Sequence, residues 1–123
     1  MRNEFDGLSG RVIGAGLAVH RALGPGFLES TYQSAFRTAL NHRGIEDEVE
    51  FPVQIVFEGV PAGLARIDLV VARAIVVELK ATDTFSPAHF AQLRSYLRAT
   101  SLRIGLLMNF NTPTLLVRRV VLG

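Results

Sequence analysis

The sequence predicts an α/β (α+β) fold, in which a mixed central sheet is flanked by helices in the order α-α-β-β-β-α-β-β. Apolar residues recur at helical spacing through the first third of the chain. Shorter apolar and alternating runs of strand length follow, with one further helical segment among them. The chain has 123 residues, 49% of them hydrophobic, which is enough to bury a core, so we expect residues 1–123 to form a single domain.

Two helices come first. Residues 5–23 form the first predicted helix, whose apolar positions are Leu8, Val12, Ile13, Ala15, Ala18, Val19 and Leu23. Gly24-Pro25-Gly26 ends this helix, because glycine and proline both interrupt helical geometry. The second helix is predicted over residues 28–42 and ends at Arg43-Gly44.

Three strands occupy the middle of the chain, predicted at residues 49–57, 64–71 and 75–81. Pro52 lacks an N–H donor, which favours an edge position or a bulge for the first of them. Glu58-Gly59 and Pro61-Ala62-Gly63 together supply the turn that follows, and Ala72-Arg73-Ala74 joins the second strand to the third.

The last third of the chain predicts a helix and two strands. Residues 82–87 form a loop, and Pro87 suits the first turn of a helix that runs to Ala99. Residues 103–110 then form a buried strand, and residues 115–122 form the last strand.

The composition excludes several kinds of site and location. There are no cysteines, so disulfides and thiolate metal sites are excluded, and the three histidines lack zinc-ligand spacing. No run approaches the ~20 apolar residues of a membrane span, and the N-terminal residues lack the order of a signal peptide. We therefore expect a cytoplasmic protein with no membrane partner. The net charge of +2 permits a polyanionic partner without requiring one.

Lys80 is the only lysine of the chain, against twelve arginines. Its ammonium is a compact point charge that can lie against a metal-bound water or a phosphate oxygen, whereas the arginine guanidinium is a planar fork. Lys80 follows Asp68 and Glu78 in the sequence. An aspartate followed about ten residues later by Glu-x-Lys is the arrangement that a Mg²⁺-dependent phosphodiesterase needs.

A hairpin of residues 64–71 and 75–81 brings these groups together if its turn has three residues. Asp68 then lies directly opposite Glu78, and Arg66 lies opposite Lys80. All four share one face because strand side chains alternate with a period of two. The other face, which we predict to be the core, is filled by Ile67, Leu69, Ile75, Val77 and Leu79.

Directly opposed carboxylates have Cβ atoms ~5 Å apart and repel each other. Such a pair needs a proton, a cation or a basic neighbour, and a hard divalent ion with oxygen ligands, Mg²⁺ or Mn²⁺, fits well. The alternative is structural: Arg66 and Lys80 neutralise Asp68 and Glu78 in a surface ladder of salt bridges.

The helix after Pro87 places His89, Gln92 and Tyr96 in one row, on the border of an apolar side made by Phe90, Leu93 and Leu97. Polar residues in this position face the edge of a cleft. The alternative makes Gln92 and Tyr96 boundary residues and His89 an ordinary first-turn residue.

Glu29 lies in the first turn of the second predicted helix, and Tyr32 shares its face one turn later. A carboxylate in a first turn complements the helix dipole, which is its simplest role. The functional interpretation makes Glu29 an additional acid near the metal.

Taken together, these residues resemble the PD-(D/E)xK nuclease superfamily and, within it, the small GxxExxY family. Gly26, Glu29 and Tyr32 stand at the naming positions of that family. The other segments that carry the resemblance are residues 66–71, 76–81, 89–97, 105–110 and 117–120. The similarity covers roughly residues 5 to 121.

The resemblance implies a restriction-endonuclease-like core, and it implies a role in one active site for each of these residues. Asp68 and Glu78 would hold Mg²⁺ (or Mn²⁺), and Lys80 would position the attacking water and stabilise the charge of the transition state. Glu29 would be an additional metal ligand. Gln92 and Tyr96 would brace the site or touch the nucleic-acid backbone, the group in which we also place His89 and Tyr32.

The leading hypothesis is therefore a Mg²⁺-dependent nuclease that hydrolyses phosphodiester bonds of DNA or RNA. The competing hypotheses are a catalytically silent module that binds nucleic acid or a protein partner on the same fold, and a purely structural hairpin. A homodimer is also considered, because the apolar final strand can pair across a two-fold axis.

Overall fold

The computed structural model describes residues 4–123, with side chains from Gly7 onward. Its elements are α1 (Glu4–Leu23), α2 (Glu29–His42), β1 (Asp47–Phe57), β2 (Val60–Val71), β3 (Ile75–Lys80), α3 (Pro87–Thr100), β4 (Ile104–Asn109) and β5 (Leu116–Val121). This order confirms the predicted fold class. Within the described range, no helix is long and apolar enough to cross a membrane.

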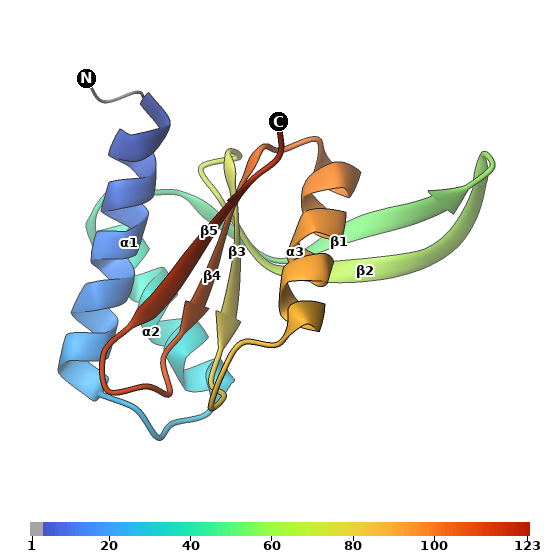
Figure 1. The fold of residues 1–123 in the computed structure, drawn as a ribbon. Coiled ribbons are helices and arrows are strands. Elements are labelled where there is room, and N and C mark those ends of the chain that lie inside the picture. The colour runs from blue at the N-terminus through green and yellow to red at the C-terminus, as the bar shows by residue number, and fades with distance from the viewer. Residues whose placement is uncertain (1–3) are drawn as a thin grey trace.

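The five strands form one mixed sheet in the order β1-β2-β3-β4-β5 (Figure 1). Only β3 and β4 run parallel, because α3 carries the chain back across the sheet between them. The other neighbouring pairs are antiparallel. β1 lies at the edge of the sheet, which is the position that Pro52 predicted.

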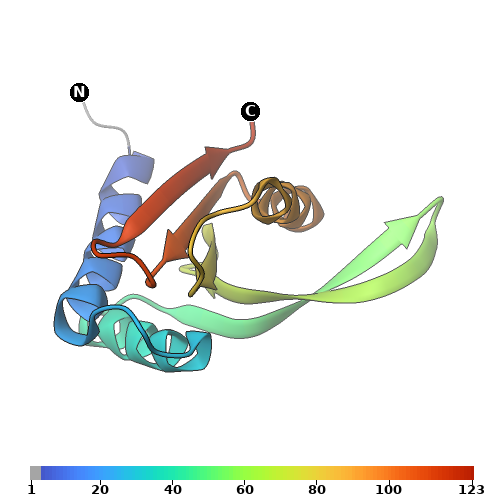
Figure 2. The ribbon, with the colours of Figure 1, turned by 60° about the horizontal axis from the view of Figure 1, so that its bottom comes forward.

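Helices cover both faces of the central strands (Figures 1 and 2). α1 and α2 pack on one face, where Val12, Tyr32 and Phe36 join side chains of β2, β3 and β4 in the larger core cluster. α3 packs on the other face, where Leu93 and Leu97 meet a second, smaller cluster. The candidate site residues of β2 and β3 therefore lie in a layer that is enclosed from two sides.

This two-sided burial corrects the prediction that one face carries the core and the other carries polar groups. Val70 and Val76 are buried under α3, on the face expected to be polar, and Ile67 joins them instead of Leu69. The alternation changes at Asp68, where the β1–β2 pairing is interrupted between Val49↔Leu69 and Phe51↔Ile67 without a change of register. Glu50, which lies opposite Asp68 in this gap, has a left-handed φ of 51°. The physical reason is this local irregularity, which turns β2 about its axis.

The turn between β1 and β2 is also shorter than predicted. Glu58 and Gly59 alone form it, both with positive φ, as a two-residue hairpin turn requires. Pro61, Ala62 and Gly63 belong to β2 instead of to the turn, next to a register shift at Ile55 and Val56. β2 pairs with β3 only from Leu69 to Val71, so the rest of the hairpin projects away from the sheet (Figures 1 and 2).

Candidate functional site

Asp68 and Glu78 lie side by side on β2 and β3, as the predicted hairpin register requires. Val71 pairs with Ile75, and the regular ladder runs as far as Leu69 and Val77. Beyond that point, side chains replace the ladder bonds. The Asp68 N–H donates to Glu78 Oε2 at 2.8 Å, and the Leu79 N–H donates to Asp68 Oδ2 at 3.0 Å. Each carboxylate is therefore held by the backbone of the opposite strand.

The surroundings of the pair disfavour two negative charges. Burial is the largest cause that raises the pKa of Glu78, to about 7, and the charge of Asp68 adds to it. Burial likewise raises the pKa of Asp68. Lys80 offsets part of this effect at both carboxyls. Without a further cation, the pair therefore retains a proton to unusually high pH.

A divalent metal ion fits this arrangement. Glu78 is only 3% exposed, and its Oε1, like Asp68 Oδ1, accepts no hydrogen bond from the described residues. No cluster of three or more His, Cys, Asp or Glu side chains suited to a metal occurs between residues 7 and 123. Mg²⁺ commonly uses one or two protein carboxylates and keeps several waters, so two open carboxylate oxygens are sufficient.

Lys80 ends β3 on the same strand as Glu78 and is half-buried. Its position is set through the parallel neighbour, where Lys80 pairs with Asn109 and the Phe110 N–H donates to the Lys80 carbonyl at 2.9 Å. Arg66 does not face Lys80, contrary to the predicted pairing. The β2–β3 ladder has ended before that point, and Arg66 pairs with Pro52 of β1 instead.

The ladder of salt bridges considered as an alternative does not form. Among the described residues, the ion pairs join Arg37 to Asp47 and Arg73 to Glu48, and neither involves the carboxylates of the site. Arg66 is exposed. Lys80 acts on Asp68 and Glu78 through its charge and not through a hydrogen-bonded ion pair.

Asn109 is a site residue that the sequence analysis missed. Its side chain is completely buried, donates from Nδ2 to the Thr82 carbonyl at 2.8 Å, and accepts the Thr82 and Asn111 N–H groups on Oδ1. These bonds tie the segment after Lys80 to the end of β4. The signal was a single amide at the end of the apolar strand Ile104–Asn109, where only a fully bonded polar group is tolerated.

Glu29 and Tyr32 occupy very different environments. Glu29 is exposed in the first turn of α2, and its charge is felt at both Asp68 and Glu78 without contact to either. Tyr32 is fully buried and stacks on Phe110 with ring centroids 4.7 Å apart. Its hydroxyl donates to the Gly24 carbonyl at 2.6 Å and accepts the Phe27 N–H at 3.1 Å. Tyr32 therefore cannot contact nucleic acid and instead holds the loop that leads to Glu29.

The row on α3 divides into a capping residue, an exposed residue and a residue within electrostatic range of the site. His89 forms a capping box with Ser86, whose N–H donates to His89 Nδ1 at 3.1 Å, so His89 serves the start of the helix. Burial, followed by the charges of Glu78 and Asp68, raises the pKa of the Tyr96 hydroxyl, so Tyr96 lies within electrostatic range of both carboxylates. Gln92, one turn earlier, is exposed.

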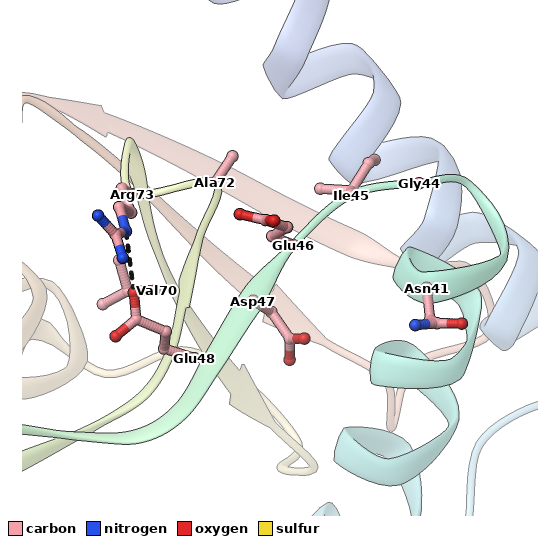
Figure 3. A pocket seen from close by; sticks show the side chains of 9 residues that line it. All are labelled: Asn41, Gly44, Ile45, Glu46, Asp47, Glu48, Val70, Ala72 and Arg73. Carbon is pink, nitrogen blue, oxygen red and sulfur yellow. Dashed lines mark ion pairs between the residues drawn. The ribbon is translucent and has the colours of Figure 1, made fainter.

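The hollow drawn in Figure 3 lies at the opposite end of β3. It has a volume of about 510 Å³ and lies beside the Ala72–Arg73 turn, with the acidic run Glu46, Asp47 and Glu48 on its wall. Glu48 forms an ion pair with Arg73 at 3.6 Å, drawn as a dashed line in Figure 3. Asp47 forms one with Arg37 at 2.7 Å. Asp47 and Glu48 are therefore paired within the chain, and the hollow shares no residue with the site at Asp68 and Glu78.

The comparisons with known proteins agree with this geometry. A family model of the PD-(D/E)XK nuclease superfamily matches residues 6–120. No curated protein and no solved structure matches the chain. The matched segment contains β1 to β4, all of β5 except Val121, the two paired acids and the one lysine. From its residues, its fold and this match, the chain belongs to the PD-(D/E)XK nuclease superfamily.

Proposed function

We propose that this protein is a Mg²⁺-dependent nuclease that hydrolyses phosphodiester bonds of DNA or RNA. The observation that carries the proposal is the pair of buried Glu78 and half-buried Asp68, in which each carboxylate accepts a backbone N–H bond from the opposite strand and keeps one oxygen open. Membership of a nuclease superfamily supports the same activity. Mn²⁺ has the same ligand preference and is expected to replace Mg²⁺.

Each residue of the site has a distinct task in this proposal. Asp68 and Glu78 hold the metal, which when bound supplies Lewis-acid activation of the phosphate and of water. Lys80 extends from the strand end next to them, so its ammonium orients the attacking water and stabilises the negative charge that develops on the phosphoryl oxygens. Its compact charge suits this task better than a guanidinium fork.

The flanking residues act through position. Glu29 adds negative charge at the start of α2, facing the pair, and supports the metal directly or through water. Gln92 and Tyr96 line the α3 side and brace the site or contact the nucleic-acid backbone. We assign the chain to the GxxExxY family within the superfamily, because Gly26 has a left-handed φ of 111° and Tyr32 clamps the loop that contains it.

The test is cleavage of a labelled oligonucleotide or plasmid with and without Mg²⁺. We expect Asp68→Asn, Glu78→Gln and Lys80→Ala each to lower the rate at least about 100-fold, the loss typical for one positioned group. Glu46→Gln is the matched control, since Glu46 is exposed on the wall of the distant hollow, and it should cleave like the wild type. Full activity of the Asp68 or Lys80 variants, or equal cleavage in EDTA, contradicts the proposal.

The alternative is a catalytically silent module that binds nucleic acid or a partner on the same fold. One observation favours it: the carboxylates already serve as acceptors for backbone N–H groups, which is a structural task in its own right. Salt-dependent binding of nucleic acid without turnover, across several metals and substrates, would establish this alternative.

A further inference from the structure

The outer part of the β1–β2 hairpin is the least covered region of the described chain. Every residue from Gln54 to Leu64, a segment that we call the arm, is exposed. The arm extends beyond β3 and past α3 into solvent (Figures 1 and 2). A two-stranded hairpin without a third strand or a covering helix is marginally stable in water. A partner that covers the arm would therefore stabilise it.

The side chains of the arm are apolar on both of its faces. Ile55 is 39% exposed, Val56 57%, Phe57 68%, Val60 62% and Leu64 60%. Taking roughly 100 Å² of exposed surface for each large apolar side chain, two arms carry about 1,000 Å² between them. That is the size at which specific protein interfaces begin.

The charge of the arm argues against a nucleic-acid partner. Glu58 is its only charged residue, and it has no lysine or arginine. Contacts to a phosphate backbone depend on basic side chains, whereas a glutamate at the tip repels the backbone. The arm is therefore suited to a protein surface.

The base of the same hairpin offers a surface that complements the tip. An apolar groove of about 580 Å³ runs between β1 and the end of α3. Its lining includes Phe51, Pro52, Val53, Ala99 and Leu102. Arg66 pairs with Pro52 across the strands, so an arginine stands at the edge of this groove.

Tip and base also complement each other in charge. Glu58 and Arg66 are both exposed, and neither makes an ion pair in the part of the chain that the structure describes. They are separated by the length of β2 from Val60 to Arg66, roughly 20 Å at strand spacing. A second hairpin laid antiparallel on the first brings each Glu58 to the other copy's Arg66.

We propose that the arm is a dimerisation element that packs on a second copy of this chain in a two-fold, tip-to-base arrangement. Phe57 of each copy seats in the groove at the base of the other, and Glu58 pairs with Arg66 across the interface. One surface supplies both the projecting group and its receiving groove, which is what an isologous two-fold contact needs. This inference does not depend on catalytic activity.

The first experiment is the mass in solution, by sedimentation or light scattering, over a range of concentrations. We expect about twice the 13.4 kDa of one chain in the micromolar range. Phe57→Ser should raise the dissociation constant at least tenfold. Leu17→Ser is the matched control, because Leu17 is 40% exposed on α1, and it should leave the dimer intact. Circular dichroism checks that both variants remain folded.

Two further variants test the groove. Ala99 is exposed on α3 and lines the groove, so Ala99→Arg should block the seat and weaken the dimer. Ala22→Arg makes the same change on an exposed position of α1 and should have no effect. Charge reversal tests the register: Glu58→Arg and Arg66→Glu should each weaken association, and the double variant should restore it.

The absence of cysteine permits a direct test of the tip-to-base geometry. A Glu58→Cys chain mixed with an Arg66→Cys chain should form a disulfide-linked heterodimer on oxidation. A wild type that stays monomeric at about 100 µM overturns the proposal. So does a dimer that Val121→Thr dissociates and Phe57→Ser does not, since that dimer uses β5. If the wild type is itself monomeric and Phe57→Ser lowers its nucleic-acid affinity, the arm belongs to nucleic acid instead.

Discussion

At the scale of single residues, the chemistry of the site depends on how Asp68 and Glu78 are withdrawn from water. One oxygen of each carboxylate accepts a hydrogen bond from a backbone N–H group, and the other oxygen accepts none from the described residues. Burial, more than their mutual repulsion, raises the pKa of Glu78. The pair therefore favours binding of a cation. Its protonation state is also coupled to folding, because the pKa of Glu78 differs between the folded and unfolded states.

This coupling predicts how stability depends on pH when no metal is bound. The folded pKa of Glu78, about 7, lies above its ordinary value of 4.5, so the folded state holds a proton that the unfolded state loses. The stability that this carboxyl contributes is present below pH 4.5 and declines as the pH rises to 7, by roughly 3 kcal/mol in total.

Denaturant unfolding in EDTA at several pH values, for the wild type and for Glu78→Gln, measures this decline. The difference between the two proteins isolates Glu78 from the other titrating groups. Added Mg²⁺ should stabilise the wild type more at pH 7.5 than at pH 5. Identical pH profiles for the two proteins would contradict the coupling.

Lys80 gives a second prediction at this scale. Lys80→Arg keeps the positive charge but replaces a compact ammonium with a larger planar group at a half-buried strand end. We expect the cleavage rate to fall roughly 100-fold or more, with folding unchanged. Arg118→Lys makes the reverse exchange at an exposed position of β5 and should not alter the rate. A Lys80→Arg variant that cleaves normally would show that any cation serves.

At the scale of elements, the site is assembled where strand ends and helix starts meet. The start of α2 faces the carboxylates because Tyr32 bonds the preceding loop at both Gly24 and Phe27. The end of β3 is fixed because Asn109 bonds Thr82 in both directions. The first turn of α3 is capped by the reciprocal hydrogen bonds of Ser86 and His89. Each of these contacts fixes the backbone position from which a proposed functional side chain extends.

The two tyrosines of the chain provide a matched test of this idea. Tyr32→Phe removes a hydroxyl with two bonds in a buried place, and we expect the free energy of unfolding to fall by about 1–2 kcal/mol. Tyr96→Phe removes a hydroxyl that makes no hydrogen bond among the described residues, and it should change stability by less than about 0.5 kcal/mol. The Tyr32 hydroxyl holds the loop that positions Glu29. In a double-mutant cycle of cleavage rates, the effects of Tyr32→Phe and Glu29→Gln should therefore be non-additive.

At the scale of the whole molecule, the sheet is pressed between α1 and α2 on one side and α3 on the other. The approach of α3 depends on Gly105 of β4, where an added Cβ would lie 2.7 Å from Leu93 Cδ1 and 2.9 Å from Cγ. Leu93 is fully buried in the smaller core cluster, so its side chain can shift only against packed neighbours. Any larger residue at position 105 therefore displaces α3, which carries Gln92 and Tyr96.

Gly105→Ala should accordingly lower the free energy of unfolding by about 1–3 kcal/mol through overpacking. Gly14→Ala is the control, since a Cβ there meets nothing within 4 Å and lies inside α1. That change should stabilise the protein by about 0.5–1 kcal/mol, because alanine is the better helix former. Thermal or denaturant unfolding of both variants distinguishes these opposite signs.

The sequence by itself determined the order of the elements and the facing of Asp68 and Glu78. Both depend on local rules: helical and strand periodicity, and a three-residue turn that sets the register. Only the tertiary structure decided that both sheet faces are buried, that Tyr32 and Asn109 support the site, and that the arm stands uncovered. Those features arise from contacts between residues far apart in the chain, and from the irregularity at Glu50 and Asp68 that turns β2. Periodicity carries no information about such contacts.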